Sequence, residues 1–182
     1  SLLRGRRGLR QSGSSRWRSA VRLDRVNDYE ALREGFAWSI PETFNFGVDV
    51  VDKWAQASPA LEALVAIDAE GNERRWTYRD MAIATDGCAG LLQQLGVRQG
   101  DRVLILLPRI AEWQIAMVAC TKIGAVSVPC VTMLTSHDLE YRVEHADVAA
   151  VITTADQVHK FDAIDGLAVR VCVGEPPPDW KR

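Results

Sequence analysis

The chain has 182 residues, of which 47% are apolar and 25% are charged, a composition that suits one well-packed globular domain. Its formal net charge is -2, but residues 1–22 carry seven arginines and no acidic residue, so the other 160 residues carry -9. This acidic body disfavours a nucleic-acid-binding surface. No apolar run approaches the roughly 18 residues that cross a bilayer, so we expect no transmembrane segment.

The Arg-rich, Ser-rich composition of residues 1–22 is typical of a mitochondrial transit peptide. A disordered basic arm or translated upstream sequence has the same composition, and these alternatives stay open. We assign residues 1–23 to a basic disordered or targeting arm, residues 24–174 to a folded domain and residues 175–182, which contain three consecutive prolines, to a linker or tail. The expected location is the mitochondrial matrix if the arm is a transit peptide, and the cytoplasm otherwise.

Two short helices and a β-hairpin are expected in the first third of the domain. Residues 27–36 have the apolar spacing of a helix, and the spacing of Val48, Val51 and Trp54 predicts a second one. A hairpin is predicted from residues 64–67 and 73–77. The intervening loop contains Gly71 and Asn72, which we expect to supply positive φ angles.

A longer amphipathic helix follows the hairpin. Thr77 and Asp80 have the spacing of a capping box, apolar residues then recur at intervals of three, four or seven, and Gly96 ends the pattern. This is the clearest amphipathic helix in the sequence.

Residues 101–130 predict a strand, a helix and a second strand without a break. Residues 103–107 are five consecutive aliphatic residues, which suits a strand covered on both faces. Residues 110–123 are almost all apolar or small, and Gly124 stands where a helix end needs a left-handed residue. The second strand, residues 125–128, is expected to stop at Pro129. Such a unit implies a parallel strand pair.

The same alternation continues to residue 173. Thr135 and Asp138 repeat the capping pattern before a helix. Residues 148–153 predict a buried strand, residues 155–164 a weaker helix and residues 168–173 a further strand. The fold class is therefore α/β, with layered helices, a mostly parallel sheet and an N-terminal β-hairpin.

Few residues stand out as carriers of chemistry. The sequence has no glycine-rich phosphate loop of the P-loop or dinucleotide-binding type. Its three histidines, His137, His145 and His159, do not have the spacing of a helical metal site, and we interpret them as surface or capping residues. Arg109 follows the carboxyl end of a predicted strand, the edge at which α/β sheets bind ligands, and is our one candidate for ligand contact.

The four cysteines are far apart in the sequence and form no CxxC pair. They lie in apolar surroundings, which favours buried thiols in a reducing compartment over a disulfide framework or a zinc site. They are Cys88, Cys120, Cys130 and Cys172.

Several segments, in order and at natural spacing, resemble the adenylate-forming (AMP-binding) enzymes, and among them the medium-chain acyl-CoA synthetases. The segments that carry this resemblance are FNFGVDVVDKW (residues 44–54), WTYRDM (76–81), GDRV (100–103), LPRIAEW (107–113), KIGAVSVP (122–129) and TSHDLEYR (135–142). The resemblance covers roughly residues 35–173. It implies that residues 24–174 are an incomplete N-terminal part of an AMP-binding synthetase domain.

The resemblance implies an ATP-dependent acid–thiol ligase that activates a carboxylic acid as acyl-AMP and transfers the acyl group to coenzyme A. ATP, Mg²⁺ and coenzyme A are then the expected cofactors of the full-length enzyme. Such chemistry needs a Ser/Thr/Gly-rich loop with a lysine, an acidic residue near the metal and a lysine from a mobile C-terminal domain. This sequence ends before all three. No catalytic residue or metal ligand of the family is carried over, and Arg109 remains the only candidate for cofactor contact.

Other interpretations stay open at this level. An adenylating relative that acts on an aryl acid would share the same N-terminal scaffold. A truncated, non-catalytic product that binds a partner, or an independent flavodoxin-like binding module, is the alternative from another class. The absence of a glycine- or hydroxyl-rich turn after the first buried strand disfavours the binding module.

Overall fold

The structure, a computed structural model, describes residues 29–182. The chain divides into two units, Ser1–Glu42 and Thr43–Arg182, which are treated separately. In the first unit, helix α1 spans Tyr29–Gly35, which confirms a helix there, while residues 27 and 28 of the predicted helix lie outside the described residues. Among the described residues, no helix is both long and apolar enough to cross a membrane.

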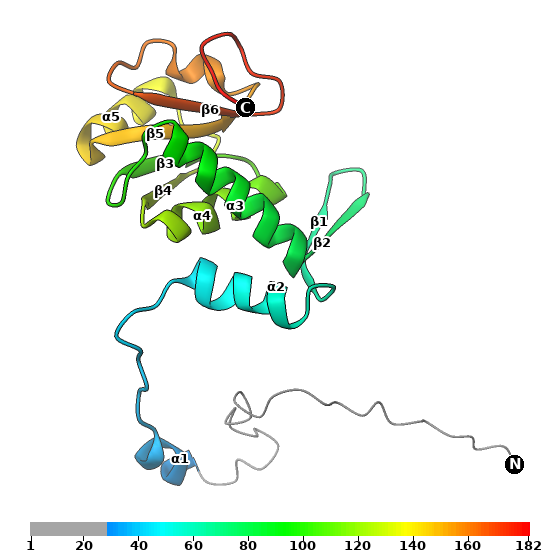
Figure 1. The fold of residues 1–182 in the computed structure, drawn as a ribbon. Coiled ribbons are helices and arrows are strands. Elements are labelled where there is room, and N and C mark those ends of the chain that lie inside the picture. Colours follow the sequence, from blue (N-terminus) through cyan, green and yellow to red (C-terminus); the bar gives the residue numbers. More distant parts are fainter. Residues whose placement is uncertain (1–28) are drawn as a thin grey trace, which may run out of the picture. The chain divides into compact units, whose positions relative to one another are not determined.

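A four-stranded parallel sheet organises the second unit (Figure 1). Its strands lie in the order β4-β3-β5-β6, and every neighbouring pair is parallel. Their bounds are Arg102–Leu106 for β3, Val126–Cys130 for β4, Val148–Thr154 for β5 and Val169–Val173 for β6. The predicted parallel α/β sheet is thus confirmed.

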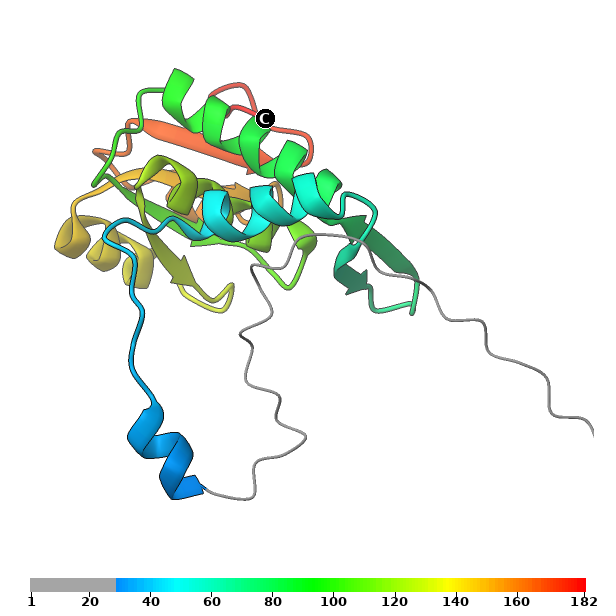
Figure 2. The same cartoon turned by 60° about the horizontal axis from the view of Figure 1, so that its bottom comes forward.

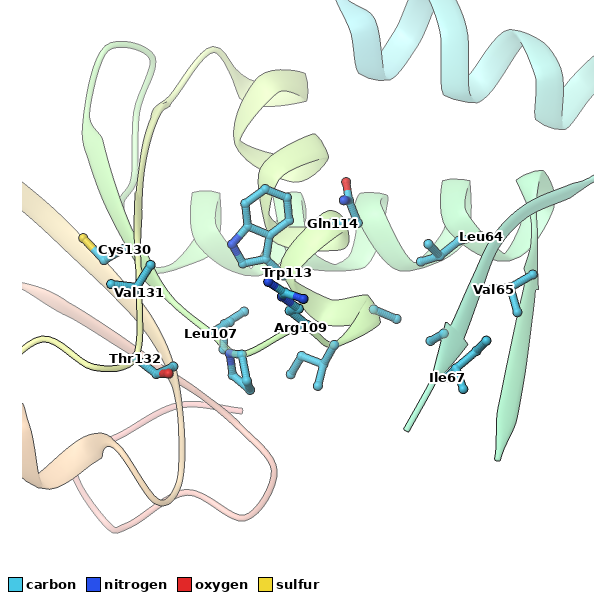
Figure 3. A pocket seen from close by; sticks show the side chains of 14 residues that line it. Leu64, Val65, Ile67, Leu107, Arg109, Trp113, Gln114, Cys130, Val131 and Thr132 are labelled. Atoms are coloured by element: carbon cyan, nitrogen blue, oxygen red, sulfur yellow. The ribbon is translucent and has the colours of Figure 1, made fainter. Parts of the chain in front are cut away.

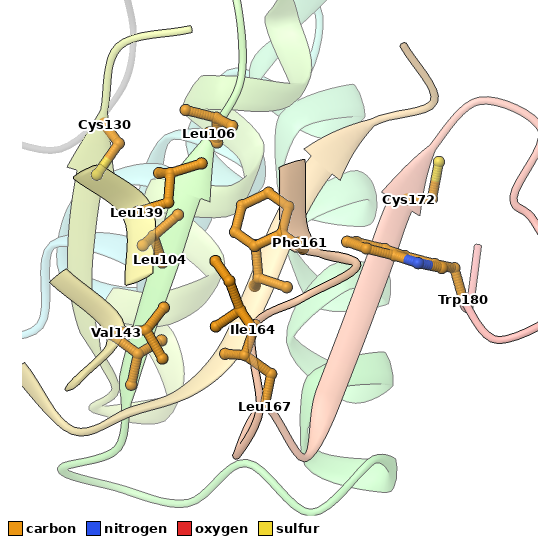
Figure 4. Close-up of a cluster of buried hydrophobic side chains, with 12 residues drawn as sticks. Leu104, Leu106, Cys130, Leu139, Val143, Phe161, Ile164, Leu167, Cys172 and Trp180 are labelled. Carbon is orange, nitrogen blue, oxygen red and sulfur yellow. The ribbon is translucent and has the colours of Figure 1, made fainter. Parts of the chain in front are cut away.

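Helices cover both faces of this sheet, because the side chains of a strand alternate between its two faces. Val103 and Ile105 pack with Leu92 on one face, against α3 (Tyr78–Gln94) and α4 (Ala111–Ile123). Leu104 and Leu106 pack on the other face against α5 (Ser136–Ala146) and η3 (Val158–Phe161), a short 3-10 helix. Figure 2 shows α3 crossing one face of the sheet, and Figure 4 shows the side chains buried on the other.

A second, two-stranded sheet precedes these layers. Strands β1 (Glu62–Ile67) and β2 (Glu73–Thr77) form the predicted antiparallel hairpin. Before the hairpin, η2 (Gly47–Asp52), a π-helix, continues into α2 (Lys53–Ala57). The expected helix is therefore present, although its first part is more widely wound than an α-helix.

The predicted helix caps are confirmed by their hydrogen bonds. Thr77 Oγ1 accepts from the Asp80 N–H at 3.2 Å, and the Thr77 N–H donates to Asp80 Oδ2 at 2.9 Å. The same capping box forms between Thr135 and Asp138: Thr135 Oγ1 accepts from the Asp138 N–H at 3.3 Å, and the Thr135 N–H donates to Asp138 Oδ2 at 2.9 Å. Gly124 ends α4 with a left-handed φ of 70°.

Three local expectations were wrong. Strand β4 does not stop before Pro129, which pairs in register with Ile105; β4 is an edge strand, where the missing N–H of a proline is tolerated. Residues 155–164 form only η3; Phe161 at its end and Ile164 three residues beyond it are both buried in the core without a longer helix. In the hairpin loop only Gly71 has a positive φ, and Asn72 does not.

Residues 175–182, expected to be a linker or tail, lie against the sheet. Lys181 forms a parallel bridge with Val171, in which its N–H donates to the carbonyl of Arg170 at 2.9 Å. Trp180 is buried and meets Phe161 edge to face, with 5.9 Å between the ring centroids (Figure 4). This segment is therefore packed against β6 rather than extended away from it.

Candidate functional site

The candidate site lies where the strand connections diverge. The loop after β3 leads to α4 on one face of the sheet, whereas the loop after β4 leads to α5 on the opposite face. Two neighbouring parallel strands whose connections leave in opposite directions open a crevice at their carboxyl ends. Open α/β sheets bind ligands where the strand order reverses, which in this sheet is between β3 and β5, so the crevice between β3 and β4 lies beside that position.

A hollow of about 660 Å³ occupies this crevice. Figure 3 shows residues of the β1 hairpin strand on one side and residues 130–132 on the other, with Arg109 and Trp113 between them. The lining is mainly apolar, and its residues are Leu64, Val65, Ala66, Ile67, Leu107, Pro108, Arg109, Ile110, Ala111, Trp113, Gln114, Cys130, Val131 and Thr132. We call this space the β3–β4 hollow.

Arg109 is the only charged residue among those that line the β3–β4 hollow. It is exposed, and it forms no ion pair with another residue of the part of the chain that the structure describes. Two further polar side chains, Gln114 and Thr132, lie in the same lining. The hollow thus combines an apolar wall with one guanidinium group and two neutral polar groups, which suits a ligand with an apolar body and an anionic end.

Hydrogen bonds and packing hold the walls of the hollow in place. Thr153 Oγ1 in β5 donates to the Leu106 carbonyl at 2.9 Å, and this buried bond fixes the carboxyl end of β3. The guanidinium of Arg74 in β2 lies 4.2 Å from the ring centroid of Trp76 and 3.9 Å from Glu112 in the first turn of α4. Because Arg74 is well exposed, we expect its ion pair to contribute little stability.

A cluster of ion pairs that joins Lys122 to Asp52 and Asp86, which we call the Lys122 latch, fixes the C-terminal end of α4, far from the hollow. Lys122 is almost fully buried, and its Nζ lies 2.6 Å from carboxylate oxygens of both Asp52 in η2 and Asp86 in α3. The side-chain amide of Asn45 donates to the Thr121 carbonyl at 2.8 Å. Sequence reasoning missed this cluster, because no local pattern joins residues 52, 86 and 122.

The cysteines do not have the properties of nucleophiles. All four are free thiols, and three of them are buried. Burial raises the pKa of the Cys88 thiol to about 11 and that of Cys120 to about 12. Burial also raises the pKa of Cys130, which lines the hollow, so that its thiol stays protonated near neutral pH.

The structure places the three histidines away from the β3–β4 hollow. His137 stands in the first turn of α5, exposed, 3.7 Å from Glu140. His145 stacks on Tyr141 in the last turn of the same helix. His159 lies in η3. None of them lines the hollow, which agrees with their interpretation as surface or capping residues.

The described residues do not offer a metal centre. Within residues 29–182, no group of three or more His, Cys, Asp or Glu side chains is placed to hold a metal ion. The donors do not fit a Mg²⁺ ion, so no metal-dependent step is assigned to them.

The sequence located only part of this site. Arg109 was named from its position after a strand, and it does line the hollow. The contribution of Leu64 and Ile67 was missed, since the sequence predicts the hairpin but not which strand ends it faces. The contribution of Thr132 was missed because it follows β4 in a loop without a recognisable motif.

Comparisons with known proteins agree on one family. Residues 51–179 match the family model described as AMP-binding enzyme. The chain is 34% identical over 144 residues to the mouse mitochondrial acyl-coenzyme A synthetase ACSM3, covering 76% of this chain and 25% of that protein. It is 35% identical over 166 residues to the rat mitochondrial acyl-coenzyme A synthetase ACSM5, covering 85% of this chain and 28% of that protein.

A solved structure shares the fold. The Mycobacterium tuberculosis fatty acyl CoA synthetase superposes with a TM-score of 0.63 at 28% identity, over 71% of this chain and 26% of that one. The present chain therefore spans about a quarter of the length of the relatives that it matches.

Proposed function

Because the chain belongs to the AMP-binding enzyme family, we propose that it is part of an ATP-dependent acid–thiol ligase that acts on a medium-chain fatty acid. In this reaction a carboxylate oxygen attacks the α-phosphorus of ATP, which forms an acyl-adenylate and releases pyrophosphate. The thiol of coenzyme A then attacks the acyl carbon, the bond to AMP breaks, and an acyl thioester results.

The observation that carries this proposal is the match of residues 51–179 to the family model, over the residues that build the sheet, α3, α4 and α5. The relatives are acyl-coenzyme A synthetases, and the apolar lining of the β3–β4 hollow suits a site that handles acyl groups. ATP, coenzyme A and a carboxylic acid are therefore the proposed small-molecule partners.

We assign the described residues to the scaffold of this enzyme and not to its reacting groups. No Ser/Thr/Gly-rich phosphate loop with a lysine occurs in the 182 residues, and Mg²⁺ has no fitting donor group among residues 29–182. The groups that hold the phosphates and the metal are proposed to lie outside these residues. The names of the relatives support a mitochondrial location.

Thioester formation by the natural protein tests the proposal. The protein is isolated from its source with an antibody to this sequence and incubated with ATP, Mg²⁺, coenzyme A and, in turn, acetate, octanoate, palmitate or benzoate. We expect octanoyl-CoA to form fastest. Faster conversion of benzoate would instead support an aryl-acid ligase, and the absence of any thioester would contradict the assignment of this chain to an acid–thiol ligase.

A further inference from the structure

We propose that the ammonium group of Lys160 holds one wall of the β3–β4 hollow in place. This wall is the turn from Val131 to Leu134, and Thr132 within the turn lines the hollow. Lys160 lies in η3, outside the lining, so it acts through the turn as a positioning residue. Its effect on the turn rests on contacts within this chain, and only the use of the hollow by the enzyme rests on the proposed function.

Two backbone carbonyl groups of the turn converge on this lysine. Lys160 Nζ donates to the Thr132 carbonyl at 2.7 Å and to the Leu134 carbonyl at 2.9 Å. The turn follows β4 and η3 follows β5, and these two strands do not pair with each other because β3 lies between them. The side chain of Lys160 therefore joins two connections that the sheet itself does not link directly.

The turn is otherwise weakly held. Its internal hydrogen bond, from the Leu134 N–H to the Val131 carbonyl, is long at 3.3 Å. Val131 and Met133 are 59% and 86% exposed, so their side chains gain little from packing, whereas Leu134 packs against the buried cluster on the α5 face. Because β4 is an edge strand, the sheet holds the start of the turn from one side only. The hydrogen bonds from Lys160 should therefore determine where the turn lies.

The charge of Lys160 is committed to this contact. Lys53 and Lys122 both pair with aspartates, whereas no carboxylate within residues 29–182 forms an ion pair with Lys160. A hydrogen bond from a charged donor contributes more to stability than one between neutral groups. An arginine at position 160 can supply such donors, but a methionine keeps only the apolar stem.

The thiol of Cys130 reports on the position of the turn. Cys130 ends β4, lines the hollow and is 9% exposed. Figure 3 shows it beside Val131 and Thr132 in the same wall. Displacement of the turn should therefore uncover this thiol. Cys120 in α4 is fully buried on the other face of the sheet and does not line the hollow, so its thiol reports on general unfolding.

The test is alkylation of the folded 182-residue chain with N-ethylmaleimide, followed by mass spectrometry of the peptides that contain Cys130 and Cys120. Lys160→Met should speed the alkylation of Cys130 about tenfold or more, because the closed turn loses its hydrogen bonds from a charged donor. Lys160→Arg should keep a rate near that of the unsubstituted chain. Lys53→Met removes a lysine that pairs with Asp49 instead, and it should leave the Cys130 rate unchanged. The Cys120 rate should not change in any variant.

An unchanged Cys130 rate in Lys160→Met would overturn the proposal. An equal rise at Cys120 would also overturn it, because the lysine would then stabilise the whole chain and not the turn in particular. Because the experiment contains neither ATP nor coenzyme A, its failure leaves the ligase assignment standing. Failure of thioester formation by the natural protein would conversely leave the result for the turn unaffected.

Discussion

The side chain of Lys122 crosses directly over Gly47, in the space that a β-carbon at position 47 would need. The atom in the way is Cγ, near the base of a side chain whose far end is held by Asp52 and Asp86. The lysine therefore cannot move aside without losing its ion pairs. This relationship ties the start of η2 to the end of α4.

Gly47→Ala should destabilise the chain by about 1–3 kcal/mol, because the added methyl group overpacks a buried contact. Urea unfolding of the 182-residue chain measures the difference. Gly87→Ala is the matched control, since a β-carbon at this helical position meets no atom within 4 Å. It should be neutral or stabilising by up to about 1 kcal/mol. An equal loss of stability in both variants would refute the role given to the Gly47–Lys122 contact.

Lys122→Met should destabilise the chain by about 2 kcal/mol. The substitution keeps most of the apolar stem but leaves Asp52, which is only about a quarter exposed, without its cation. The comparison is Lys53→Met, which removes the pair with Asp49, a carboxylate about as exposed as Asp52. Because the Lys53 side chain is more than half exposed whereas that of Lys122 is almost fully buried, this loss should cost less than about 0.5 kcal/mol. The free energies of unfolding of both variants and of the unsubstituted chain are measured in the same buffer. Similar losses of stability in the two variants would show that the Lys122 latch contributes no more than a surface pair.

Acid should weaken the two helix caps. The side-chain hydroxyls and backbone N–H groups of Thr77 and Thr135 donate to Asp80 and Asp138, and they lower the pKa of each carboxyl below its usual 3.8. A carboxyl whose pKa is lower in the folded state binds its proton more weakly there than in the unfolded chain. Its stabilising contribution is therefore complete above the unfolded pKa and is lost as the pH falls through the folded pKa.

The measurement is the free energy of unfolding between about pH 6 and pH 3. The double substitution Asp80→Asn and Asp138→Asn should reduce the loss of stability in this range. Asp165→Asn, an exposed aspartate outside both caps, should leave it unchanged. If the double variant keeps the full pH dependence, other groups govern the acid response.

The packing of residues 175–182 on β6 predicts a large effect of Trp180. Its indole ring is 6% exposed and packs against Phe161. Trp180→Ala should destabilise the chain by about 3 kcal/mol, as expected for loss of a buried aromatic side chain. The neighbouring Asp179→Ala, at an exposed position, should change stability by less than about 0.5 kcal/mol. An unfolding midpoint unchanged by Trp180→Ala would restore the interpretation of this segment as a free linker.

The sequence predicted those features that local physics determines. Five consecutive aliphatic residues predicted the buried strand β3. The spacing of Thr135 and Asp138 predicted the start of α5, and Gly124 predicted the end of α4. Each depends on the period of a strand or on a hydrogen bond within one turn. The fold class followed from the order of these elements.

The sequence could not predict features that depend on distant segments. Lys122 meets Asp52 across 70 positions of sequence, and no local spacing encodes such a pair. Pro129 is accommodated only because β4 lies at the edge of the sheet, which depends on the strand order. The β3–β4 hollow likewise needs the β1 hairpin strand to face the ends of β3 and β4, so only Arg109 could be named in advance.

The exchange of labelled pyrophosphate into ATP, in the presence of octanoate, tests the central claim most directly. It is measured in parallel on the natural protein isolated from its source and on the 182-residue chain alone. If the chain is scaffold from an acyl-CoA synthetase, the natural protein should catalyse octanoate-dependent exchange and the 182-residue chain should not. Exchange by the chain alone, or its absence from the natural protein, would contradict this account.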